Sequence, residues 1–79
     1  MPRFYFNIIS DGRGNDRDDT GQELPHRHAA WEMATRYAGE SLCDLDGDLP
    51  PDGEWRLEVC TGDGARIFQI TVRASQNPG

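Results

Sequence analysis

Two histidines separated by one residue are the first candidates for metal chemistry. His26 and His28 stand at the start of a predicted helix, and Glu32 follows His28 by four residues, on the same helix face. A zinc site uses three or four ligands at fixed spacing, and only two are credible here. We therefore expect exposed histidines and no bound metal or other cofactor, with His26 and His28 as minor metal candidates.

Two acidic runs have the oxygen ligands that calcium prefers. Residues 44–54 carry carboxylates at alternate positions, but an EF-hand loop needs glycine sixth and glutamate twelfth, where this run has Leu49 and Trp55. The run from Asp16 to Gly21 has a glycine in sixth place and Arg27 in twelfth. The pattern favours solvated loops whose aspartates bond their own backbone.

The two cysteines give little support for nucleophilic catalysis. Cys43 falls on the polar face of the predicted helix, and Cys60 alternates away from the predicted core. Neither has a local base and an orienting third group, and the pair forms neither a CxxC site nor a disulfide framework. A chain of 79 residues also offers little concavity for a substrate. We expect no enzyme, no catalytic residues and no small-molecule substrate.

The charge balance disfavours nucleic acid. The chain has 14 acidic and 8 basic residues, a formal charge of −6, and every basic residue is arginine. Arg3, Arg56 and Arg73 nevertheless share a predicted sheet face with Tyr5, and arginines with aromatics can stack bases. Glu58 shares that face as well. A nucleic-acid-associated regulator, similar to antitoxins, is therefore the alternative rather than the preferred function.

The elements that position these residues follow from the apolar pattern. Alternation predicts strands at 4–9, 55–61 and 66–73, with an Asp-Gly turn between the last two. A short edge strand is expected at 20–24 after a loop at 11–21, and an amphipathic helix opens at Leu24-Pro25 and ends near 44–47. Nine apolar residues share the predicted core face: Phe4, Phe6, Ile8, Trp55, Leu57, Val59, Phe68, Ile70 and Val72. This predicts an α+β fold, β-(β)-α-β-β, with one helix on one face of a three- or four-stranded antiparallel sheet.

Several segments resemble a family of short bacterial proteins catalogued as a domain of unknown function. They are the opening Met1–Phe6, the Asp-x-x-Gly-x-Glu-Leu-Pro segment at 18–25, the alanine-rich helix start and the late hairpin with Asp63-Gly64. The resemblance implies the same architecture and no known activity. His26 stands where members are expected to have an aspartate, which puts the helix start in question.

Four apolar residues are predicted on the sheet face away from the helix. These are Tyr5, Ile9, Cys60 and Ile67, and Arg56 and Arg73 lie on the same side. Burial against a second copy, or pairing through an edge strand, would explain them. We expect a single domain over 1–79 with an ordered core at about 2–73, a flexible tail at 74–79 and a cytoplasmic location. The predicted function is a non-enzymatic protein-binding or regulatory module, with self-association as one form of it.

Overall fold

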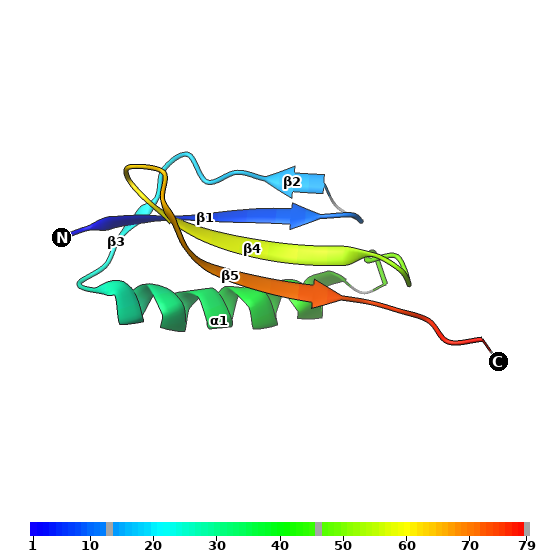
Figure 1. Cartoon of the computed structure of the whole chain (residues 1–79). Coiled ribbons are helices and arrows are strands. Elements are labelled where there is room, and N and C mark those ends of the chain that lie inside the picture. Colours follow the sequence, from blue (N-terminus) through cyan, green and yellow to red (C-terminus); the bar gives the residue numbers. More distant parts are fainter. Residues whose placement is uncertain (13, 46, 79) are drawn as a thin grey trace.

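The computed structural model describes residues 1–12, 14–45 and 47–78. The elements follow one another as β1 (Arg3–Ser10), β2 (Gly14–Asp16), β3 (Gln22–Glu23), α1 (Arg27–Leu45), β4 (Glu54–Thr61) and β5 (Arg66–Arg73). Helix α1 runs along one side of an antiparallel sheet (Figure 1). The expected α+β architecture, with one helix packed on one face of the sheet, is therefore confirmed.

The sheet has five strands in the order β2-β1-β4-β5, with β3 also paired to β1. Strand β2 pairs with the Ile8–Ser10 end of β1 and β3 with the Arg3–Phe4 end, so the two short strands share one edge. The expected edge strand at 20–24 is present as β3. The expectation of an unbroken loop at 11–21 was wrong, because that segment contains β2 and gives the sheet its fifth strand.

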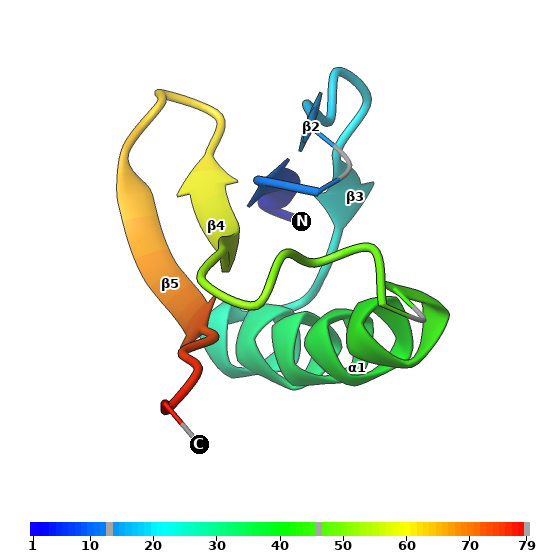
Figure 2. The same cartoon turned by 90° about the vertical axis from the view of Figure 1, so that its right-hand side faces the viewer.

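The core lies between the sheet and α1, as the alternation predicted. Trp55, Leu57 and Val59 of β4 are at most 1% exposed, while the core-facing residues of β5 are only partly buried. The helix contributes small side chains to this layer, because its buried residues include Ala30, Ala34 and Ala38. Alanines let the helix approach the sheet closely, and Figure 2 shows α1 lying across the open side of the curved sheet.

Helix α1 begins at Arg27, two residues after the predicted opening at Pro25. His26 is the N-cap: its Nδ1 accepts a hydrogen bond from the Ala29 N–H at 3.1 Å, and its carbonyl accepts one from Ala30 N–H. The side-chain bond satisfies an N–H group that the first helical turn leaves unpaired, whereas the bond to the carbonyl is the first regular bond of the helix. The histidine at this position therefore takes over the acceptor role of the expected aspartate.

The predicted helix end near 44–47 agrees with the last helical residue, Leu45, which is buried. Gly47 follows with a positive φ of 90°, a backbone conformation that favours glycine after a helix. Asp46, part of the predicted calcium run, lies outside the described residues. Within the described part of the chain, no helix is long and apolar enough to cross a membrane.

Candidate interaction surface

The sheet face opposite α1, called the outer face below, brings together five of the six predicted interaction residues. Tyr5 of β1 stands opposite Cys60 of β4, and Ile9 stands opposite Arg56. All four side chains are half-buried. Arg73 lies on the same face at the end of β5, opposite Glu54.

Ile67 does not belong to the outer face, and its expected position there was wrong. Cys60 pairs with Arg66 and Val59 pairs with Phe68, so Ile67 is an extra residue at a β-bulge. Its side chain packs against the core cluster. The bulge breaks the alternation, and Arg66 takes the outer-face position that simple parity assigned to Ile67.

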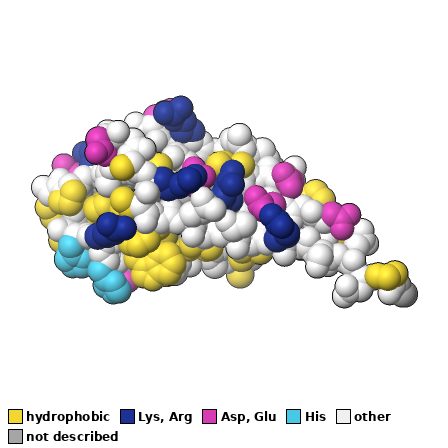
Figure 3. All heavy atoms as spheres, viewed as in Figure 1, with side chains coloured by type: hydrophobic (Ala, Val, Ile, Leu, Met, Phe, Trp, Pro, Cys, Tyr) yellow, Lys and Arg dark blue, Asp and Glu magenta, His cyan; other side chains and the backbone are white. Residues whose placement is uncertain are grey.

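A row of alternating charges crosses the outer face over β4 and β5. Arg73 Nη2 lies 2.9 Å from Glu54 Oε1, and Arg66 Nη1 lies 2.8 Å from Glu58 Oε2. Arg56 sits between the two glutamates, with Nε 3.4 Å from Glu58 Oε2 and Nη1 4.0 Å from Glu54. Figure 3 shows the arginines beside acidic side chains along this face. The hydrogen bond to Glu54 raises the pKa of Arg73.

This pairing bears directly on the predicted arginine face. Three arginines meet two glutamates there, so most of their positive charge is compensated within the protein. Arg3 is also engaged, 3.4 Å from Glu23 and donating to the Thr20 carbonyl. A phosphate backbone would have to compete with these contacts, which weakens the argument for nucleic acid.

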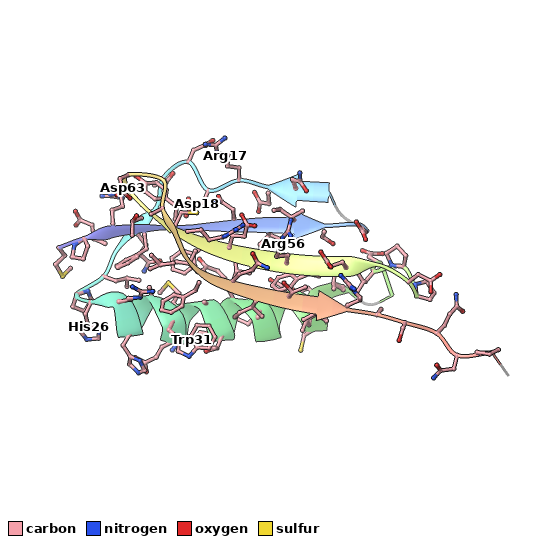
Figure 4. The ribbon with its side chains drawn as sticks, viewed as in Figure 1. Arg17, Asp18, His26, Trp31, Arg56 and Asp63 are labelled. Atoms are coloured by element: carbon pink, nitrogen blue, oxygen red, sulfur yellow. The ribbon has the colours of Figure 1, made fainter. Side chains whose placement is uncertain are left out.

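Asp18 anchors the segment between β2 and β3 to the middle of β1. Its Oδ2 accepts the Phe6 N–H at 3.1 Å, at a point of the β1 edge that neither short strand reaches. Its Oδ1 accepts the N–H groups of Thr20 (3.1 Å) and Gly21 (2.9 Å), and its own N–H donates to Asn7 Oδ1. The carboxylate thus replaces a missing strand partner, and Figure 4 shows Asp18 beside β1.

The electrostatics of Asp18 follow from these contacts. Burial alone would raise its pKa. The backbone N–H groups of Gly21, Phe6 and Thr20, together with the charge of Arg3, outweigh burial and lower it. Asp18 is therefore ionised in the folded state at neutral pH, and its contacts hold the β2–β3 segment against β1.

Gly21 completes this anchor, because the chain passes very close to β1 there. Its φ is 74°, and a Cβ at this position would lie 2.8 Å from both Arg3 Cγ and Tyr5 Cε2. Only glycine tolerates both the positive φ and this contact. The Asp-x-x-Gly spacing noted in the sequence is thus explained by the attachment of β3 to β1.

A hollow of about 300 Å³ opens on the outer face, between this anchored segment and the β4–β5 turn. Tyr5, Asn7 and Cys60 line it, and Asn7 Nδ2 lies 3.9 Å from Cys60 Sγ. Asp63 orders the turn beside it by accepting hydrogen bonds from the Thr61 hydroxyl and the Ala65 N–H, which lower the pKa of Asp63. The sequence predicted Tyr5 and Cys60 as residues of this face. It did not predict Asp18 and Asp63, which order the two segments on either side of the hollow.

The free edge of the sheet belongs to β5, which pairs only with β4 in the described structure. The Ala74 N–H donates to the Gly53 carbonyl. Because backbone groups alternate in direction along a strand, those of Val72 and Ile70 also point at β4. The N–H and C=O groups of Gln69, Thr71 and Arg73 therefore point to the open edge. At the start of the strand, the Arg27 guanidinium donates to the Ile67 carbonyl at 3.3 Å.

The minor metal candidates do not meet further ligands. The rings of His26 and His28 are 6.4 Å apart, and His28 Nε2 lies 3.9 Å from Glu32 Oε1, with both side chains largely exposed. Among the described residues, no three histidine, cysteine or carboxylate side chains are grouped as a metal site would need. His26 uses its Nδ1 as a helix cap instead.

Comparison with known proteins gives a family and no activity. A family model, DUF6894, a domain of unknown function, matches residues 3–73, which span every strand and the helix. Neither the comparison with curated proteins nor the comparison with solved structures found a match. The expected membership of a domain-of-unknown-function family is thereby confirmed. The chain belongs to the DUF6894 family.

Proposed function

We propose that the chain is a non-enzymatic protein-binding module that associates through the open edge of β5. The partner we infer is a second copy, whose β5 pairs antiparallel with the first and extends the sheet. Such a contact uses the same surface on both copies, as a two-fold interface requires. Main-chain hydrogen bonds along the edge would supply affinity, as in other cases of strand addition.

The observation that carries this proposal is the incomplete burial along β5. Its core-facing residues Phe68, Ile70 and Val72 are partly exposed, whereas Leu57 and Val59 of the neighbouring β4 are at most 1% exposed. A strand added beside β5 would cover this apolar surface. The edge would then become as well buried as the middle of the sheet.

The same edge continues onto the helix. Trp31 of α1 is 37% exposed, and its ring lies 5.2 Å from that of Phe68. Figure 4 shows Trp31 projecting from α1. Aromatic residues at the border of an open edge are typical anchors of protein interfaces.

Strand β5 has few of the features that usually prevent an edge strand from pairing with another chain. Natural edges carry charges, prolines or bulges that discourage pairing. β5 has arginines only at its two ends and a bulge near its start, while the stretch from Gln69 to Val72 is uncharged. These four residues are therefore open to a partner strand, and the backbone N–H and C=O groups of every second one point to the edge.

Thr71→Pro tests the proposal, because proline removes the edge-directed N–H without breaking a bond to β4. Sedimentation velocity over a concentration series should show a monomer–dimer equilibrium for the wild type and a monomer for Thr71→Pro. Thr71→Ala, which keeps the N–H, is the matched control and should associate as the wild type does. A wild-type chain that stays monomeric at its highest soluble concentration would contradict self-association through β5.

The nucleic-acid alternative predicts a different result. Replacing Arg56 and Arg73 together with glutamate would abolish nucleic-acid binding if that were the function. We expect no binding of the wild type to mixed DNA or RNA at physiological salt, since these arginines already contact glutamates. Salt-dependent binding that the double variant loses would favour the alternative.

A further inference from the structure

A groove lies on the other side of the molecule, between the flank of α1 and the β1–β2 edge. Its larger part, about 450 Å³, is lined by Phe6, Ile8 and Tyr37 together with the segment from Asp16 to Gln22. A smaller part of about 170 Å³ adjoins it, because Ile8 and Asp16 line both. The larger volume falls within the range of about 300–1,000 Å³ that is typical of small-molecule sites.

The smaller part contains a buried polar group without a partner. Ser10 is 4% exposed, lines this hollow, and its Oγ has no hydrogen-bond partner in the described structure. It shares the helix-facing side of β1 with Ile8, two residues earlier. A buried hydroxyl is nearly always hydrogen-bonded, so an unpartnered one at a hollow is a position that a donor group of a ligand can fill.

The carboxylate of Asp16 lies beside the hollow that Ser10 lines. Asp16 stands opposite Ile8 in the β1–β2 pairing, so its carboxylate is on the helix-facing side at the junction of the two hollows. Asp16 forms no ion pair with any described residue. A carboxylate and a hydroxyl beside an apolar floor match a positively charged group with an apolar body.

We propose that this groove binds a small organic cation consisting of an ammonium group on an apolar body. The ammonium group donates to the Asp16 carboxylate, and rotation of the buried Ser10 side chain brings its Oγ into the smaller hollow to accept a second hydrogen bond. The apolar body lies against Phe6, Ile8 and the Tyr37 ring, which itself packs on Phe6 at 5.4 Å between centroids. The site is separate from the β5 edge, on the opposite border of the sheet.

Titration with 2-phenylethylammonium, followed by amide NMR shifts, tests the proposal. Binding should shift the resonances of Ile8, Ser10 and Asp16. The neutral isostere 2-phenylethanol should bind about fivefold more weakly, as should the cation to Asp16→Asn. Ser10→Ala should weaken the cation about tenfold and should fold normally, since it removes only an unpartnered hydroxyl.

Asp52→Asn is the matched control, because Asp52 is an exposed aspartate whose side chain accepts a hydrogen bond from Gln76, away from the groove. It should bind the cation as the wild type does. Equal affinity for the cation and the alcohol, or an unchanged affinity in Asp16→Asn, would overturn the proposal. A second probe, N-acetyl-lysine methylamide, presents the ammonium group on a peptide. If it binds more tightly than 2-phenylethylammonium, the ligand is a lysine of a protein and the small-molecule assignment is overturned.

Discussion

Replacing Asp18 with alanine should cost more stability than any other single change of a half-exposed acidic residue in this chain. The carboxylate accepts three backbone N–H groups, from Phe6, Thr20 and Gly21, and so joins the middle of β1 to the β2–β3 segment. Without it, the Phe6 N–H is left partly buried, with no strand opposite it. The N–H groups of Thr20 and Gly21 can turn to water.

The magnitude follows from these different environments. An unsatisfied, partly buried N–H costs about 1–3 kcal/mol, and hydrogen bonds whose donors regain water cost about 0.5–1 kcal/mol each. One such N–H and two such hydrogen bonds together give an expected loss of about 2–5 kcal/mol in the free energy of unfolding of Asp18→Ala. For a domain of this size that corresponds to a fall in Tm of about 8–40 °C.

Chemical denaturation at neutral pH measures this loss, with Asp19→Ala as the matched control. Asp19 is the next residue, and its ion pair with Arg17, at 4.0 Å, joins two side chains that are 86% and 89% exposed. The control should change stability by less than about 0.5 kcal/mol. Equal effects of the two substitutions would refute the structural role of Asp18.

Three further predictions concern the same region of the chain. Gly21→Ala should cost about 1–3 kcal/mol in urea denaturation, because the alanine Cβ would meet Arg3 and Tyr5 at 2.8 Å and φ is 74°; an unchanged midpoint would contradict the close approach. His26→Ala should lower the free energy of unfolding by about 0.5–1 kcal/mol in thermal denaturation, because it removes the cap. His26→Asp should raise it by about 0.3–1 kcal/mol, since aspartate keeps the cap and adds a favourable charge at the helix start. Equal Tm values for the wild type and both variants would exclude the cap. Because the folded-state pKa of Asp18 is lowered from 3.8, its contribution is present above that pH and is lost as the pH falls through the folded value. Acid titration of stability should therefore show a smaller loss for Asp18→Asn than for the wild type, and identical acid profiles would exclude this linkage.

The long elements could be predicted from the sequence because their patterns are strong. Strict alternation identified β1, β4 and β5 and their core face, and the helical period identified α1. The nine predicted core residues all pack as expected, including Trp55 and Leu57 at the centre. Each pattern is local, so no knowledge of the pairing was needed to find it.

The features that the sequence did not reveal depend on contacts between distant residues. β2 consists of Gly14, Asn15 and Asp16, which have low β propensity and form a strand only by pairing with β1. Ile67 moves to the core side because of a bulge that exists only in the register of β4 and β5. The Asp-x-x-Gly spacing was noticed, but its anchoring role requires the Phe6 N–H, twelve residues away.

Amide hydrogen exchange of Thr71 as a function of protein concentration tests the proposed β5 pairing most directly. The Thr71 N–H points to the open edge, so in the monomer it has no bond to β4 to protect it. If two β5 strands pair, its protection should rise with concentration, while Ile70, bonded to β4, stays protected throughout. Fast exchange of Thr71 at every concentration would contradict association through this edge.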